Sequence, residues 1–260
     1  MSLSEREQVE VERSASEASK IVVKPVDVDR YRNPPAKTAF PLEYAFHLLG
    51  EVRGKTVLDL GCGSGENLIP LVHRGAHVIG IDISPELISI ARQRLDKAGL
   101  SAIVRVGSAY QTGMADESVD VVFCMSLIHH LDIATAREEM RRVLRPGGSI
   151  VLKEPVRFSK GYERLRSLFP SHENISEYEH PLTSEELSAF QQTFEVTGLR
   201  YFRLPFVALV QRFLPAIARP FWYASDWILR SLPSVKRYAT TVALRLQKQA
   251  LSDSSPELGP

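Results

Sequence analysis

The amino-acid sequence predicts an α/β fold built on a doubly wound, mostly parallel β-sheet. Three observations support this class. Short apolar runs alternate with amphipathic helical stretches, those stretches are long enough to connect parallel strands, and glycines stand where the helices should end. The chain has 260 residues and is 44% hydrophobic, which is enough for one sizeable domain with embellishments.

Five apolar runs have the length and composition of buried strands. In chain order they are TVLDL (56–60), HVIGID (77–82), AIVRV (102–106), VDVVFC (119–124) and SIVLKE (149–154). The helical stretches between them are ENLIPLVHRG, PELISIARQRLDKAG and IATAREEMRRVLR. We expect Gly75 and Gly99 to end the first two helices, and Pro146-Gly147-Gly148 to end the third.

The remaining segments surround this core. Thr183 and Glu186 form a capping-box pattern that predicts a helix, and EVTGLRYFRL after it predicts a strand. The expected divisions are residues 1–36 (a partly disordered N-terminal lid), 37–203 (the core, with an insertion at 156–182), 204–236 (an apolar helical insertion), 237–250 (a closing strand) and 251–260 (a disordered tail).

Composition excludes several classes of protein. The net charge of +1, with no concentrated basic stretch in the core, argues against a nucleic-acid partner. Cys62 and Cys124 have no CxxC partners, so we expect neither disulfides nor a cysteine zinc site, and a cytoplasmic location fits best. The charged first 20 residues do not resemble a signal peptide. No apolar run approaches the roughly 18 residues that span a bilayer.

A glycine-rich turn follows the first strand directly, in the sequence TVLDLGCGSGENL. Gly61, Gly63 and Gly65 allow a tight turn and close approach of a ligand. A dinucleotide fingerprint would need a fourth glycine at the position of Glu66, whose carboxylate would repel a pyrophosphate. Together with Asp59 just before the turn, this favours a cationic or zwitterionic ligand.

The second strand ends in a carboxylate, Asp82, within VIGIDIS. A carboxylate there can accept hydrogen bonds from both hydroxyls of a ribose. The next residue, Ile83, can pack against a flat base. These two positions therefore predict a nucleoside ligand, and the glycine turn beside them favours one that carries an amine instead of a diphosphate.

Four ordered motifs, VLDLGCGSG, VIGIDIS, DESVDVVFCMSLIHHL and MRRVLRPGGSIVLKEP, resemble those of class I S-adenosylmethionine-dependent methyltransferases. The resemblance is closest to the small-molecule enzymes of ubiquinone and menaquinone biosynthesis, and it covers about residues 40–155. It implies a Rossmann-like fold, S-adenosylmethionine as cofactor, S-adenosylhomocysteine as product, and no metal.

The resemblance also implies roles for single residues. Asp59 and the glycine turn would hold the methionine part of the cofactor, Asp82 its ribose and Ile83 its adenine. Ser108 stands where the family often has an Asp that reaches the adenine amine, so adenine recognition falls to this hydroxyl or to the backbone at Ala109. The implied cofactor-binding set is Asp59, Gly61, Cys62, Gly63, Gly65, Asp82, Ile83, Ser108, Ala109, Met125 and Tyr31, with Tyr31 as a lid residue.

Two adjacent histidines, His129 and His130, lie just past the fourth strand, where open α/β sheets bind ligands. Adjacent side chains point in different directions, and there is no HxxxH spacing, so a metal site is the weakest interpretation. One imidazole is a candidate catalytic base, and Glu154 at the end of the fifth strand could orient it or act as the base itself. The alternatives are that both histidines only contact ligands, or only fill space.

Candidate substrate contacts are less specific. His172, Glu173 and His180 in the 156–182 insertion could lie above the pocket, although a solvated polar cap has the same sequence. Residues 205–236 hold both tryptophans, including Trp222, with Arg and Lys spread among apolar positions. This segment could cap an apolar pocket, form a homodimer interface, or make peripheral contact with a membrane.

The sequence thus predicts methyl transfer from S-adenosylmethionine to an oxygen or activated carbon of a hydrophobic small molecule of quinone, phenolic, lipid or natural-product type. CMSL follows the fourth strand in place of the Asn/Asp-Pro-Pro-aromatic tetrad of amine and base methyltransferases. Methylation of nitrogen or of a macromolecule is the alternative within enzymes. A non-catalytic protein that binds S-adenosylmethionine is the alternative outside them.

Overall fold

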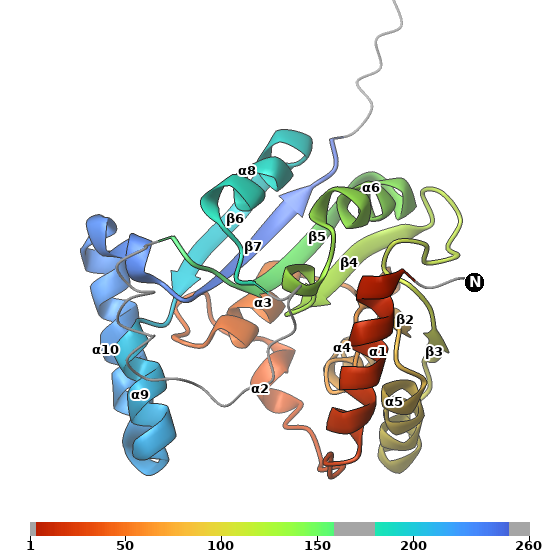
Figure 1. Ribbon diagram of the computed structural model, residues 1–260, viewed down its shortest axis with the longest axis horizontal. Coiled ribbons are helices and arrows are strands. Elements are labelled where there is room, and N and C mark those ends of the chain that lie inside the picture. Colours follow the sequence, from red (N-terminus) through yellow and green to blue (C-terminus); the bar gives the residue numbers. More distant parts are fainter. Residues whose placement is uncertain (1–3, 159–179, 250–260) are drawn as a thin grey trace, which may run out of the picture.

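The computed structural model describes residues 4–158 and 180–249. Figure 1 shows a central twisted sheet with helices on both faces and a helical hairpin at one end. The sheet has seven strands in the order β3-β2-β1-β4-β5-β7-β6. Their bounds are β1 Thr56–Leu60, β2 His77–Asp82, β3 Ile103–Val106, β4 Val119–Met125, β5 Leu144–Pro155, β6 Glu195–Phe202 and β7 Thr241–Gln247.

The directions of the strands determine at which edge of the sheet the site lies. β3, β2, β1, β4 and β5 are parallel, whereas β7 pairs antiparallel with both β5 and β6. β6 therefore runs in the same direction as the parallel strands and ends at the same edge of the sheet. The chain builds outward from β1 to β3 and then returns to β4, so the carboxyl ends of β1 and β4 flank the switch point where such sheets bind ligands.

Helices cover both faces, as a doubly wound sheet requires. Alternate strand residues face opposite layers: Leu58 packs in the core beneath α6 and α8, and Val57 in the core beneath α3, α4 and α5. The helical bounds are α1 Glu5–Ala18, α2 Asp29–Arg32, α3 Pro41–Leu49, α4 Leu68–His73, α5 Pro85–Ala98, η1 Ile128–His130, α6 Ile133–Val143, α8 Ser184–Thr193, α9 Pro205–Phe213, η2 Pro215–Ile217, α10 Ala218–Ser231 and η3 Pro233–Tyr238.

Most predicted elements coincide with observed ones, and the largest shift is at the start of β5. Helix α6 ends at Val143, and the Pro-Gly-Gly segment that we expected to stop it lies inside β5 instead. The pairing of β4 with β5 shifts register between Val119 and Val121. Gly147, with φ +73°, accommodates the irregular backbone at this point.

The first part of the predicted lid is a regular helix, although we expected partial disorder. The hydroxyl of Ser4 accepts from the backbone N–H of Glu7, and the Glu7 carboxylate accepts from the backbone N–H of Ser4, which completes a capping box at the start of α1. α1 packs against α5, beside the carboxyl edge of the sheet (Figure 1). It is therefore placed to cover the switch point.

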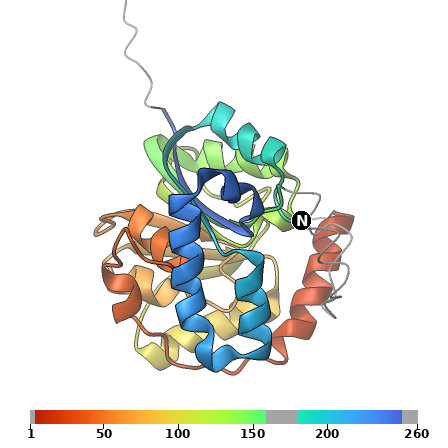
Figure 2. The same cartoon turned by 90° about the vertical axis from the view of Figure 1, so that its left-hand side faces the viewer.

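The segment predicted as apolar and helical forms a hairpin of α9 and α10. Figure 2, with this end toward the viewer, shows the two helices side by side, with α1 (red) at the right-hand edge of the view. The strand expected over 237–250 is β7. It does not lie at the edge, because it inserts between β5 and β6 and joins them.

Candidate active site

The glycine turn after β1 has the geometry that its sequence predicted. The backbone N–H groups of Gly61 and Cys62 both donate to the carbonyl of Ile81, at 2.8 and 3.0 Å, which ties the turn to β2. Gly65 has φ +81°, and a Cβ atom there would lie 2.9 Å from the Cβ of Ala91 on α5. A side chain at this position would push the turn away from α5, so only glycine fits.

Asp59, the last residue but one of β1, is a buried carboxylate with neither oxygen hydrogen-bonded by a residue that the structure describes. Burial, with a smaller contribution from the charge of Asp82, raises the pKa of Asp59 to about 8. A buried, unpartnered carboxylate is costly unless a donor or a positive charge arrives beside it. Asp59 therefore has the chemistry to accept from an ammonium group of a ligand, although its side chain lies behind the residues that line the pocket.

Asp82, at the end of β2, is held in place by its own backbone surroundings. Its two carboxylate oxygens accept from the N–H of Ser84 at 3.0 Å and of Gly63 at 2.8 Å. Burial raises the pKa of this carboxyl. Because each oxygen keeps a further lone pair, Asp82 can still accept two hydroxyl hydrogens, as a ribose requires.

A pocket opens at the carboxyl ends of β1, β2 and β4. It holds about 880 Å³ of empty space, part of it open to solvent. Its lining includes Gly61, Gly63, Asp82, Ile83 and Ala109, all of them predicted cofactor contacts. The sequence motifs, which lie far apart in the chain, thus meet around one cavity.

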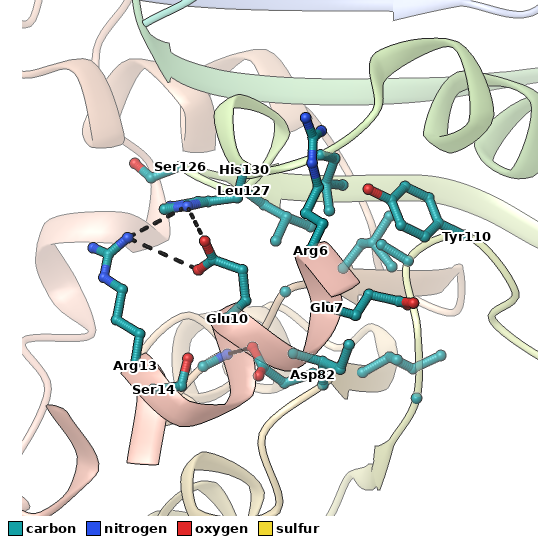
Figure 3. Close-up of a pocket in the computed structure, with 18 of the residues that line it drawn as sticks. Arg6, Glu7, Glu10, Arg13, Ser14, Asp82, Tyr110, Ser126, Leu127 and His130 are labelled. Atoms are coloured by element: carbon teal, nitrogen blue, oxygen red, sulfur yellow. Dashed lines mark hydrogen bonds and ion pairs between the residues drawn. The ribbon is translucent and has the colours of Figure 1, made fainter. Parts of the chain in front are cut away.

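The other wall of this pocket is α1, which belongs to the segment predicted as a lid, although no motif predicted which of its residues would line the cavity. Figure 3 shows Glu10 and Arg13 of α1 pointing toward His130, and Glu7 pointing to the side on which Tyr110 lies. The lining residues from α1 recur at the spacing of one helical face: Arg6, Glu7, Glu10, Arg13, Ser14 and Glu17. The capping-box pattern Ser4–Glu7 was the one available signal for a helix there, and nothing in the sequence showed what that helix would face.

Ser108 meets α1 at one end of the pocket. Its hydroxyl is buried and donates to the carboxylate of Glu7. The same hydroxyl accepts from the backbone N–H of Tyr110 at 3.0 Å. The position where the family often has a carboxylate thus has one after all, supplied by a residue 101 positions earlier in the chain.

The two histidines differ in their surroundings. His129 is buried, and its Nδ1 donates to Oε2 of Glu154 at 2.7 Å. The other oxygen of Glu154 accepts from the N–H groups of Leu127 and Ile128 at 2.9 and 3.0 Å. Glu154 is fully buried and holds the η1 turn, so it does not reach the cavity.

His130 lines the cavity. Its Nδ1 lies 3.3 Å from Oε1 of Glu10 and 3.5 Å from Nη1 of Arg13, both on α1 (Figure 3). The rings of His129 and His130 do not point apart as we expected of adjacent residues: their centroids are 4.0 Å apart, because η1 is a tight 3-10 turn.

The junction between β4 and η1 carries backbone strain. Ser126 has φ +57°, which is uncommon for a residue with a Cβ, and it lines the pocket. The Nζ of Lys153 donates to its hydroxyl at 2.6 Å, and its N–H donates to the Lys153 carbonyl at 2.7 Å. Met125, which was predicted to contribute a cofactor contact, packs its side chain against the core, and the next residue, Ser126, lines the cavity.

Other predicted site residues lie elsewhere. Tyr31 packs on Phe46, with ring centroids 4.8 Å apart, and Trp222 packs on Phe40 at 5.6 Å; neither lines the pocket. Burial raises the pKa of the Cys62 thiol, which suits a small spacer in the turn and not a nucleophile.

The remaining predicted contacts fall in or beside the insertion. His180 donates its backbone N–H to the carbonyl of His129 at 3.2 Å, and its side chain lies 2.9 Å from Glu186. His172 and Glu173 lie outside the described residues. Within 4–158 and 180–249, no three His, Cys, Asp or Glu side chains gather as a metal site would need.

Comparison with known proteins finds relatives of this core. Residues 58–152 match the family model described as a methyltransferase domain. A ubiquinone biosynthesis O-methyltransferase of Alkalilimnicola ehrlichii is 31% identical over 123 residues, which are 46% of this chain and 50% of that protein. The chain spans half or less of the length of the curated relatives that it matches.

Solved structures show the same fold over more of the chain. Geranyl diphosphate C-methyltransferase from Streptomyces coelicolor, solved with Mg²⁺, geranyl diphosphate and S-adenosylhomocysteine, has a TM-score of 0.64 at 16% identity and covers 95% of this chain and 100% of its own. The [4+2]-cyclase SpnF has a TM-score of 0.57 at 17% identity, with 92% and 93% covered. Residues 58–152 thus match a methyltransferase domain, and most of the chain shares the fold of these solved structures.

Proposed function

We propose that the protein transfers a methyl group from S-adenosylmethionine to an oxygen or activated carbon of a hydrophobic small molecule. The observation that carries this proposal is the unpartnered, buried carboxylate of Asp59 beside the glycine turn. An ammonium group at this point would relieve the cost of burying it. The diphosphate of a dinucleotide would instead meet Asp59, Asp82 and Glu66.

We assign the cofactor contacts accordingly. Asp59 would accept from the amino group, the glycine turn would approach the methionine part, and Asp82 would accept from the ribose hydroxyls. Ile83 and Ala109 would lie against the base, since both line the cavity. When bound, the cofactor supplies an electrophilic methyl group on a sulfonium sulfur.

His130 is the residue that we assign as catalytic base. A hydroxyl or enol acceptor must lose its proton as the methyl group arrives, and an imidazole suits that transfer near neutral pH. Glu10 and Arg13 contact its Nδ1 from α1, which leaves Nε2 for the acceptor. His129 and Glu154 act by positioning, because together they fix the turn that carries His130.

The first experiment measures release of S-adenosylhomocysteine with a panel of phenolic, quinone and lipid acceptors. We expect turnover with at least one oxygen or carbon acceptor and a slower rate with amines. The fold alone does not fix this outcome, since the [4+2]-cyclase SpnF shares it. Tight binding of S-adenosylhomocysteine without turnover on any acceptor would instead support the non-catalytic alternative.

The α9–α10 hairpin supports a membrane-borne acceptor. Because β6 ends at the same edge of the sheet as the pocket, the hairpin projects from that edge too. At its tip, Phe213 and Ile217 are 65% and 50% exposed, with exposed Arg212 and Arg219 beside them. Exposed apolar side chains flanked by arginines match the boundary of an anionic bilayer.

The charge of the hairpin points to an anionic membrane and not to a second copy of the same basic surface. Its acid, Asp226, is already paired with Arg200 and with Arg230, the latter at 3.0 Å. Further cations on the exposed surface are Lys236 and Arg237. Of the helices that the structure describes, none has the length and apolar character to cross a bilayer, so this contact would be peripheral.

Flotation with vesicles tests the membrane contact. We expect the protein to float with phosphatidylglycerol vesicles at low salt and not with phosphatidylcholine alone. Replacing Phe213 and Ile217 with Ser should abolish flotation, whereas Ile103→Ser, which removes a 62% exposed side chain from the edge strand β3, should not. A protein that stays unbound, or that instead forms a dimer dependent on Phe213, contradicts this assignment.

A further inference from the structure

We propose that Glu7 of α1 selects an adenine base by accepting a hydrogen bond from its 6-amino group. This inference rests on the proposed function, because it concerns the base of the same cofactor. The contacts assigned above come from the sheet and its loops. This hydrogen-bond acceptor comes instead from α1, the helix that covers the pocket.

The position of Glu7 carries the first step. Glu7 lines the cavity, as do Ile83, Gly107 and Ala109, which form the end of the pocket assigned to the base. Its side chain is 7% exposed, and it reaches across from α1 to the hydroxyl of Ser108 (Figure 3 shows its carboxylate in the pocket wall). A ligand base lying on Ile83 would thus meet this carboxylate at its edge.

The charge state of Glu7 carries the second step. Burial by itself would raise its pKa, but hydrogen bonds from the side chain of Ser108 and from the backbone and side chain of Ser4 outweigh burial and lower the pKa. Glu7 is therefore ionised at neutral pH, and an ionised carboxylate can only accept. Oε2 of Glu7 accepts from the backbone and side chain of Ser4, whereas Oε1 accepts from Ser108 and keeps a further lone pair for a donor from the ligand.

The substituent at position 6 of a purine determines whether the Glu7 carboxylate favours or disfavours that base. The 6-amino group of adenine donates, whereas the 6-oxo group of hypoxanthine or guanine would place a second acceptor against a negative charge. A hydrogen bond to a charged group contributes roughly 1.5–3 kcal/mol, which corresponds to about 10- to 150-fold in affinity. A site with a fixed acceptor rejects the analogue that lacks the donor.

The test compares two ligands by calorimetry: S-adenosylhomocysteine and S-inosylhomocysteine, its 6-oxo analogue. We expect wild type to prefer the adenosyl compound by about 100-fold. In Glu7→Gln the amide can either accept or donate, so the adenosyl compound should weaken, the inosyl compound should tighten, and the ratio should fall to within a few fold. Gln at this position keeps the capping box, so α1 should stay folded.

Glu12→Gln is the matched control, since Glu12 is exposed on α1 and does not line the cavity. It should leave both affinities unchanged. If Glu7→Gln weakens both ligands equally, or changes neither, then Glu7 serves only to hold α1 and the inference is overturned. If wild type binds neither ligand, the proposed function fails instead, so the two failures are distinct.

Discussion

Asp59→Asn is expected to make the ligand-free protein more stable and the cofactor complex much weaker. The two effects share one cause, the buried carboxylate without a partner. Its folded pKa of about 8 lies above the ordinary value of 3.8. The unfolded chain therefore ionises first as pH rises, and the carboxyl penalises folding increasingly from about pH 4 until the penalty is complete above pH 8.

The asparagine variant removes that penalty without changing the size of the side chain. We expect its thermal midpoint to exceed that of wild type by roughly 2–8 °C at pH 8, for a gain of about 1–2 kcal/mol, and the excess to shrink toward pH 5. Affinity for S-adenosylhomocysteine should fall by about 10- to 100-fold, because the amino group loses a charged acceptor. Differential scanning fluorimetry and calorimetry measure the two quantities.

Asp82→Asn gives the contrast, because the Asp82 carboxylate already accepts from the N–H groups of Gly63 and Ser84. The NH₂ group of an asparagine at this position would face one of these two N–H donors. This variant should therefore lose both stability and affinity for S-adenosylhomocysteine. A lower midpoint for Asp59→Asn at pH 8, or an affinity within twofold of wild type, would contradict the role that we give to Asp59.

The core of the fold and half of the site were predictable from the sequence because they depend on local patterns. β1 and β2 coincide with their apolar runs, since each is a short buried strand bounded by a turn. The glycine turn and Asp82 follow directly from those strands. Their places around one pocket then follow from parallel pairing, which brings the carboxyl ends of β1 and β2 to one edge.

The rest of the site could not be predicted because its contacts join distant parts of the chain. Ser108 receives its carboxylate from Glu7, 101 residues away, and His130 meets Arg13, 117 residues away. The spacing of residues within a polar helix does not show which face of that helix will pack over a pocket formed by other parts of the chain. The positive φ of Ser126 at the end of β4 is likewise not visible in the sequence.

The histidine pair shows how one buried contact separates two residues that look equivalent in sequence. His129 donates to Glu154, whose other oxygen holds the backbone of the turn, whereas His130 faces the cavity and the α1 side chains. His130→Ala is therefore expected to lower kcat by about 10²- to 10⁴-fold, measured with the best acceptor of the panel, and to leave the thermal midpoint close to that of wild type.

His129→Ala should behave in the opposite way. It leaves Oε2 of the buried Glu154 without the imidazole N–H, at a cost of about 2 kcal/mol, or a midpoint lower by roughly 4–8 °C. Its kcat should fall less than that of His130→Ala. Its rate should still decrease at acid pH as that of wild type does, because the catalytic base, His130, is still present. If instead both variants keep the acid limb of the wild-type rate profile, neither imidazole removes the proton, and His130 only aligns the acceptor with the methyl group.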